Sequence, residues 1–321
     1  GWIFRLAGQH GRAASGTPIR MDEVLIEDDG GRSKLAVIDI EGIIFGGLFG
    51  GSSAGPVQMV REQLRRAEQD PAVKAVVLRI DSPGGEVLAA DDIYRGIEEF
   101  QQRSGKPVIA SMGSVAASGG YYVAAPCRWI VANPLTITGS IGVIMHGYNY
   151  RNLMNKIGVR PEVYKSGRFK DMLSGDKEVE EILPEERQMV QALVDETFGR
   201  FKEVVAAGRQ GPQRLPGDEG RALTSNWQEY VDGRVFSGRQ AHDWGFVDEL
   251  GDFQTAVKRA KALAQIDRAQ LIRYEQPFEL GSLFRLLLQS ETRAVKLDMG
   301  IDFPPLEAGR LYFLFLPGIR S

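Results

Sequence analysis

The stretch VKAVVLRIDSPGG, residues 73–85, decides the fold class of this chain. Its first eight residues, 73–80, are mostly aliphatic and β-branched, which is typical of a parallel strand buried on both faces. The strand then ends in the turn sequence Asp81-Ser-Pro-Gly-Gly85. Because open α/β sheets bind ligands beyond the carboxyl ends of their strands, this turn is the first candidate for a functional site.

Units of one strand and one helix recur on both sides of this stretch. This alternation is typical of an α/β fold with a mostly parallel sheet. The predicted domain spans residues 33–275. Within it the pattern predicts strands at 35–46, 107–112, 128–133 and 270–275, and helices at 57–69, 87–103, 185–208 and 252–265.

The two ends of the chain differ from this domain. Residues 1–32 are polar and rich in Gly, Arg and Asp, and we expect an N-terminal arm, either a membrane-proximal remnant or a region added for expression. The tail, 276–321, contains an amphipathic segment at 280–288 and the apolar run RLYFLFL at 310–316. That run is too apolar to be left in water and too short to span a bilayer. We expect it to dock on a neighbouring subunit, in a substrate groove as a peptide mimic, or on its own core.

Composition limits the function classes. With 43% hydrophobic and 25% charged residues, the chain resembles a soluble globular enzyme. A net charge of −3 argues against a nucleic-acid partner. No run reaches the roughly 18 apolar residues of a membrane-spanning helix. The single cysteine, Cys127, cannot form an intramolecular disulfide, and its apolar neighbours predict a buried hydrophobic residue.

Ser118 lies in SVAASGGYY, residues 114–122, at a predicted strand-to-helix turn. Small residues on both sides allow a sharp bend that leaves the hydroxyl accessible. If Ser118 caps the next helix, backbone N–H groups point toward its surroundings, where they would stabilise the negative charge of an acyl-transfer transition state. A simple helix cap is the alternative, and these nine residues alone favour it.

The turn at 81–85 favours a nucleophilic Ser118 over a simple helix cap. Two glycine-bearing turns after consecutive strands predict an oxyanion hole beside an edge that docks a substrate strand. Paired glycines let a substrate backbone approach and leave N–H groups free to donate. We expect a β-carbon at Gly85 to crowd the substrate and misplace one donor.

A nucleophilic serine also needs a base. His10 lies in the arm and His242 in a polar turn, whereas His146 follows Ser118 at a spacing compatible with a triad. The competing candidate is Lys170 in KSGRFKD, after a short strand predicted at 161–165. A lysine acts as a base only if its pKa falls well below the usual value of about 10.4, which burial among apolar groups can cause. The residues themselves leave both candidates open.

Four motifs occur in a fixed order along the chain: DSPGG, MGSVAASGGYYVA, TITGSIGVI and KSGRFKD. Together with the later GRVFSGRQAHDWGFVDELG, they resemble the signal peptide peptidase A (SppA) family of bacterial membrane-associated peptidases. The match covers residues 33–275, and the chain is similar in length to the short, single-repeat members. The resemblance implies a ClpP/crotonase-like α/β core with helical assembly elements.

The resemblance also implies a role for each matching residue. Ser118 would be the nucleophile, Lys170 the general base and Ser140 the residue that orients the lysine amine, while the N–H groups of Gly85 and Gly119 would form the oxyanion hole. The implied reaction is hydrolysis of extended, hydrophobic peptides, such as remnant signal peptides, through an acyl-enzyme. It requires no metal and no organic cofactor.

The family further implies a ring-like homo-oligomer, in which Lys170 reaches the serine of its own chain or of a neighbour. It implies association with the bacterial cell membrane through a segment absent from this chain, with the peptidase domain on the extracytoplasmic side. Two other functions stay open. One is a crotonase-type acyl-CoA hydratase or hydrolase with an acidic base, and the other is a non-catalytic membrane-associated scaffold.

Overall fold

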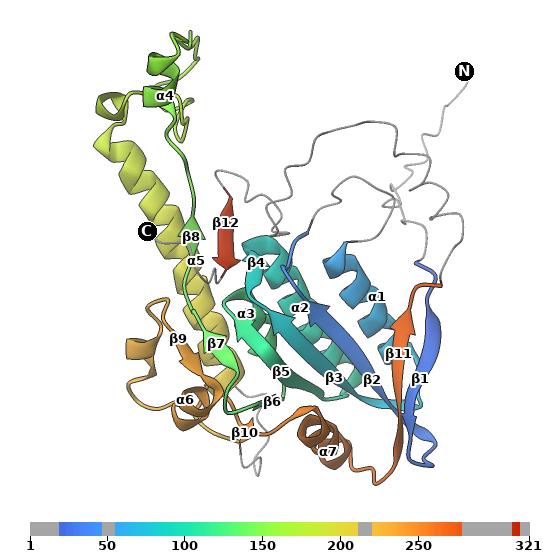
Figure 1. Ribbon diagram of the computed structural model, residues 1–321. Helices are drawn as coiled ribbons and strands as arrows, with labels where there is room; N and C mark the ends of the chain where they lie inside the picture. The colour runs from blue at the N-terminus through green and yellow to red at the C-terminus, as the bar shows by residue number, and fades with distance from the viewer. Residues whose placement is uncertain (1–18, 47–54, 211–219, 278–309, 315–321) are drawn as a thin grey trace, which may run out of the picture.

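A computed structural model describes residues 19–46, 55–210, 220–277 and 310–314 of the chain (Figure 1). In this part, nine strands form one sheet in the order β1-β11-β2-β3-β5-β6-β10, with β7 and β9 extending from β5. The strands are β1 (Asp22–Asp28), β2 (Ser33–Glu41), β3 (Val73–Ser82), β5 (Val108–Ala117), β6 (Trp129–Ala132), β7 (Ile137–Gly139), β9 (Val235–Ser237), β10 (Glu249–Leu250) and β11 (Ala269–Glu275). The pairs β1–β11 and β7–β9 are antiparallel and the other pairs are parallel. The predicted α/β class with a mostly parallel sheet is confirmed.

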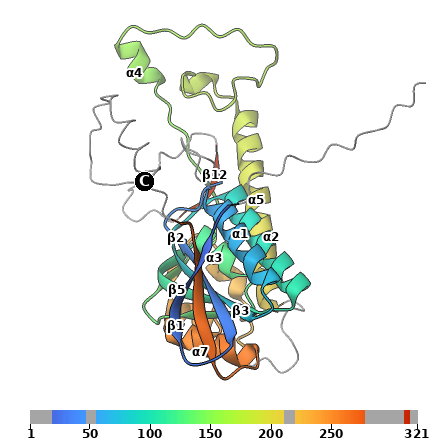
Figure 2. The ribbon, with the colours of Figure 1, turned by 90° about the vertical axis from the view of Figure 1, so that its right-hand side faces the viewer.

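Helices cover both faces of this sheet (Figures 1 and 2). The helices of the described residues are α1 (Pro56–Gln69), α2 (Val87–Ser104), α3 (Gly119–Ala124), α4 (Arg151–Lys156), α5 (Pro184–Gln210), α6 (Gly238–Asp243) and α7 (Phe253–Leu263), with short 3₁₀ helices at Val179–Glu181 and Trp227–Tyr230, and all but α4 lie near the sheet. Alternate residues of β2 face opposite sides: Ile38 packs in the cluster with α1 and α2, and Val37 in the cluster with α7. Both faces are apolar because parallel strands bury both of them.

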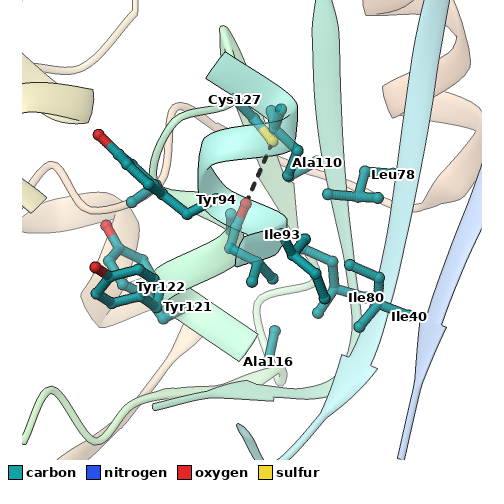
Figure 3. Close-up of a cluster of buried hydrophobic side chains, with 14 of the residues drawn as sticks. Ile40, Leu78, Ile80, Ile93, Tyr94, Ala110, Ala116, Tyr121, Tyr122 and Cys127 are labelled. Atoms are coloured by element: carbon teal, nitrogen blue, oxygen red, sulfur yellow. Dashed lines mark hydrogen bonds between the residues drawn. The ribbon is translucent and has the colours of Figure 1, made fainter. Parts of the chain in front are cut away.

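The larger core lies between the sheet and helices α2 and α3, and Figure 3 shows part of it. Tyr121 and Tyr122 of α3 are fully buried there. Cys127 is also buried, and burial raises the pKa of its thiol above the usual value. The prediction that Cys127 is a buried hydrophobic residue is confirmed.

Part of the N-terminal arm has regular structure. Residues 22–28, which the sequence analysis assigned to that arm, form β1 and pair antiparallel with β11. All seven residues are exposed, so β1 extends the edge of the sheet without enlarging the core. The sequence pattern missed it because an exposed edge strand needs no alternation of apolar residues.

The C-terminal run forms a second, three-stranded sheet with two distant segments. Here β12 (Leu311–Leu314) lies between β4 (Gly84–Glu86) and β8 (Ile144–Met145), antiparallel to both. Of the arrangements predicted for this run, the structure shows docking on the turn that follows β3. The amphipathic segment predicted at 280–288 lies outside the described residues.

An arm projects from the sheet. Helix α5 packs its C-terminal half on the core through Phe201, Val204 and Val205. Its N-terminal half extends outward, and the segment between β8 and α5, which includes α4, lies at its outer end in both views (Figures 1 and 2). The buried Lys177 amine contacts Glu186 at 2.7 Å and ties this segment to the start of α5.

A buried ion pair holds the inner end of α5. The Arg209 guanidinium donates to both carboxylate oxygens of Asp248, at 2.9 and 2.6 Å, and both side chains are fully buried. Asp248 also accepts hydrogen bonds from the Ile130 and Arg221 backbone N–H groups. The pair therefore joins α5, β6 and the loop before β10.

Asp248→Asn should lower the free energy of unfolding by about 3–5 kcal/mol, because it leaves the buried Arg209 charge without its counter-ion. The measurement is urea unfolding followed by circular dichroism. Asp232→Asn is the matched control, since Asp232 pairs with Arg234 at the surface and exposed pairs contribute little. Equal, small losses in both variants would contradict the role given to the buried pair.

Candidate active site

Ser118 lies at the sharp turn between β5 and α3. It occupies the N-cap position of α3 with φ 54° and ψ −116°, a backbone conformation that non-glycine residues rarely adopt. Its side chain makes no capping hydrogen bond to α3. The simple helix cap, which the nine residues around Ser118 favoured, is therefore not what the structure shows. Strained serines at strand-to-helix turns are typical of hydrolase nucleophiles.

Ser140 lies beside Ser118 because β5 and β7 are paired in parallel. The register aligns Ala117 with Gly139, so each serine is the residue directly after an aligned pair. The Ser118 N–H donates to the Gly139 carbonyl at 2.8 Å, and Ser140 also has a positive φ, of 49°. Both serines are buried. The structure thus brings together two serines that lie 22 positions apart in the chain.

The turn after β3 lies against the start of α3. A Cβ built on Gly119 would lie 3.0 Å from Gly84 Cα and 3.1 Å from the Gly85 nitrogen. The N–H groups of the Gly85–Gly119 pair therefore belong to one small region next to Ser118. This is the arrangement that an oxyanion hole requires.

The tail strand passes directly through this region. In the β4–β12 register Phe313 is opposite Gly85 and Leu314 opposite Gly84. The Phe313 carbonyl oxygen would lie 3.1 Å from a Cβ on Gly119 and 2.0 Å from a Cβ on Gly84. A main-chain carbonyl of the tail thus lies beside the turn after β3 and the start of α3.

The structure corrects the reason given for a glycine at position 85. A Cβ on Gly85 would meet the Ile44 carbonyl oxygen at 1.8 Å, so this glycine permits close packing of two backbone segments and does not face the substrate. The glycine that a docked strand needs is Gly84, which has a φ of +101°.

Gly84→Ala should therefore lower peptide turnover by about 10²-fold or more, because its methyl group would displace the docked carbonyl and disturb the donor pair. Turnover of a quenched fluorogenic peptide measures the loss. Gly105→Ala is the matched control, since Gly105 also has a positive φ, of 67°, but its added Cβ would contact nothing. If both variants lose the same activity, backbone strain and not crowding is responsible.

The side chain of Phe313 packs against two aromatic side chains. Its ring stacks on Tyr122, with ring centroids 4.8 Å apart, and lies 4.6 Å from Phe201 of α5. Burial raises the pKa of the Tyr122 phenol, which stays neutral and donates to Asp91 at 2.8 Å. These rings form a ready-made pocket for a large apolar side chain. The sequence analysis did not identify Phe201, whose only signal was its place on the apolar face of a long helix.

Lys170 lies elsewhere in the same chain. Its segment lies at the start of α5, where Arg168 contacts Glu185 at 3.1 Å, whereas Phe201, which contacts Phe313, lies nearer the other end of that helix. Glu185 and Phe201 lie about 24 Å apart along the helix axis, since an α-helix rises about 1.5 Å per residue. The Lys170 side chain is exposed. The structure therefore brings Ser118, Ser140, Gly85 and Gly119 together but does not bring Lys170 of the same chain to them.

The surroundings of Lys170 also differ from those predicted. Residues 161–165, the predicted short strand, have no regular structure. Lys165 pairs with Asp171 at 2.8 Å. Lys177 is no alternative base, because its hydrogen bond to Glu186 raises the pKa of its amine and keeps it charged.

His146, the other candidate base, follows β8 on the far side of β12 from β4. Its Nε2 atom is buried without a hydrogen-bond partner in the part of the chain that the structure describes. No hydrogen bond joins it to Ser118 among those residues. His242 receives a hydrogen bond from Arg221, and His10 lies outside the described residues.

The sequence of the chain is similar to those of known proteases. Residues 100–267 match the model of "Peptidase family S49". The chain is 39% identical to "Putative protease slr0021" of Synechocystis over 248 residues, which cover 77% of this chain and 80% of that protein. It is 33% identical to "Putative signal peptide peptidase SppA" of Enterococcus faecium, over 79% of this chain and 70% of that protein. It is 35% identical to "Protease 4" of Haemophilus influenzae, over 72% of this chain but 35% of that longer protein.

The matched region includes the segment from β5 to α7, and so contains Ser118, Ser140 and the whole projecting arm. The resemblance stated from the four ordered motifs is thereby confirmed. The chain belongs to peptidase family S49, and it is a protease of the SppA type.

Proposed function

We propose that this protein is a serine endopeptidase that cleaves extended, hydrophobic peptides through an acyl-enzyme. One observation carries the proposal. A strand of the chain itself, β12, lies between β4 and β8 with a carbonyl beside the Gly85–Gly119 pair and an aromatic side chain in the pocket of Tyr122 and Phe201. A substrate strand would add to the same two edges, which is a common mode of peptide recognition.

In the proposed reaction Ser118 Oγ attacks the carbonyl carbon of the peptide bond, and its proton passes to a base. Charge develops on the carbonyl oxygen, where the N–H groups of Gly85 and Gly119 stabilise it. The base then protonates the leaving amine, and water hydrolyses the resulting ester in a second, equivalent step. The pairing of β5 with β7, which places Ser140 beside Ser118, supports Ser140 as the residue that orients the base.

Lys170 is the base in this proposal, supplied by a neighbouring copy of the chain. The arm supports this assignment, because it holds Lys170 away from Ser118 of its own chain and projects it outward. The arm also exposes large apolar side chains, including Tyr164 at 92% and Ile157 at 67%, which a subunit interface would cover. A ring-like homo-oligomer would bring Lys170 to the Ser118 of a neighbouring copy and would cover these apolar side chains.

Peptides would reach this site at a bacterial membrane, as the resemblance implies, and remnant signal peptides have the required apolar sequence. None of the helices in the described part of the chain is long and apolar enough to cross a bilayer. The membrane association stays a prediction.

The alternative functions are tested by reaction with a fluorophosphonate, which labels activated serines. Intact-mass measurement should show one adduct per chain, and peptide mapping should place it on Ser118. A crotonase-type enzyme with an acidic base, or a scaffold, would give no adduct at this position. Because lysine-dependent serine peptidases react slowly with such reagents, the incubation is extended and compared with heat-unfolded protein.

A further inference from the structure

A carboxylate lies at the edge of the groove, the space between β4 and β8 that β12 fills, in a position to select one substrate side chain. Glu86 is the last residue of β4 and the N-cap of α2, and its backbone is paired with Tyr312 of the docked strand. The Glu86 side chain is only 15% exposed. Its Oε2 atom accepts a hydrogen bond from the Gly46 N–H at 3.0 Å, which fixes the carboxylate in place.

The second oxygen of this carboxylate binds the tail. Glu86 Oε1 lies 2.5 Å from Nη1 of Arg310, the residue immediately before β12. Arg310 precedes Phe313 by three residues, and the Phe313 carbonyl lies at the proposed oxyanion hole. Glu86 therefore contacts the side chain at a fixed position upstream of the bond that would be cleaved.

Helix α2, which follows Glu86, also favours the binding of a cation by this carboxylate. A carboxylate at a helix N-terminus interacts favourably with the positive end of the helix dipole, which adds to the Gly46 hydrogen bond in holding the Glu86 side chain. It makes no side-chain cap to α2, so its outer oxygen binds the Arg310 guanidinium and not the helix backbone. Charge-assisted hydrogen bonds from a guanidinium to a carboxylate are among the stronger polar contacts in proteins.

We infer that the groove selects peptides with a basic residue three positions before a large aromatic residue, and that Glu86 determines the basic preference. The aromatic side chain enters the pocket of Tyr122 and Phe201, and the bond after it is the one cleaved. The segment Arg310-Leu-Tyr-Phe-Leu314 is an example of this pattern within the chain itself. This inference rests on the proposed function, because it names the substrate of the same site.

The test compares three quenched fluorogenic peptides that differ at one position, containing RLYFL, ALYFL or ELYFL, on the full-length protein. The expected ratio of kcat/KM between the Arg and Glu peptides is about tenfold or more, as for a partly buried charge-assisted contact. The tail competes equally with all three peptides, so it cancels from these ratios. Glu86→Lys should invert the order, and Glu86→Gln should make the three peptides nearly equal.

Glu99→Lys is the matched control, since it makes the same charge change on the exposed surface of α2. It should keep the preference for arginine. An equal shift in both lysine variants would overturn the inference, because it would show that overall charge attracts the peptides. Equal kcat/KM for the three peptides on the unaltered protein would overturn it as well.

A binding measurement separates failure of this inference from failure of the proposed function. Fluorescence anisotropy of the same labelled peptides on the Ser118→Ala protein reports recognition without cleavage. If the unaltered protein cleaves none of the peptides but the Arg peptide binds most tightly, the proposed function is wrong and the specificity of Glu86 stands. If the peptides are cleaved and bound without any preference, the specificity is wrong and the peptidase function stands.

Discussion

Ser118→Ala should reduce peptide hydrolysis by on the order of 10⁶-fold, the size of effect known for loss of a nucleophile in serine peptidases. Only the attacking oxygen is removed, so nothing in the variant can form the acyl-enzyme. The alanine keeps the same strained backbone, and we expect the thermal midpoint and the oligomer size to be unchanged. Turnover of a quenched apolar peptide and intact-mass analysis after fluorophosphonate treatment are the two measurements.

Ser114→Ala is the matched control for this variant. Ser114 lies on the same strand, β5, four residues earlier, and its side chain is exposed. It should retain full turnover and the fluorophosphonate adduct. Substantial activity in Ser118→Ala would exclude Ser118 as the nucleophile, whatever the behaviour of the control.

Lys170→Ala should be nearly as inactive as Ser118→Ala, and the double variant should be no worse than either, because a nucleophile and its base act as one unit. Lys170→Arg should also fail, since a guanidinium does not release its proton at a usable pH. Ser140→Ala should show a milder loss, because the amine would be less well oriented but still present. Lys156→Ala, another exposed lysine of the arm, should remain active.

Mixing the two inactive variants tests where the base comes from. If Lys170 acts on the serine of a neighbouring copy, co-refolded Ser118→Ala and Lys170→Ala chains should regain part of the activity, because some sites combine an intact serine with an intact lysine. If the pair forms within one chain, no mixed site is complete and activity stays absent. An inactive His146→Ala beside an active Lys170→Ala would replace the proposed base with the histidine.

The fold was predictable from local sequence to a large extent. The apolar run at 73–80 and the other short apolar runs specify strands because each fills both faces of a layered core. The amphipathic segments between them specify helices. Small residues around Ser118 and in the turn at 81–85 specify sharp bends. The order of four motifs predicted the family, which the comparisons confirm.

Other features depended on contacts between distant segments. The proximity of Ser118 and Ser140 follows from the register of β5 and β7, and a register is set by packing and not by either strand alone. The role of Gly84 depends on what a β-carbon would meet, and the neighbours are Phe313 and Gly119 from other parts of the chain. No local pattern contains that information.

The sequence by itself determined the α/β class, the peptidase family and the residues that carry its motifs, because these are encoded in short segments. Only the tertiary structure decided that Lys170 lies far from Ser118 of its own chain, since the direction of the arm is set by how the inner half of α5 packs on the core. Only it decided that the tail strand enters the groove and that Arg310 meets Glu86, because a strand finds its place by backbone pairing and complementary charge across more than 200 residues of chain.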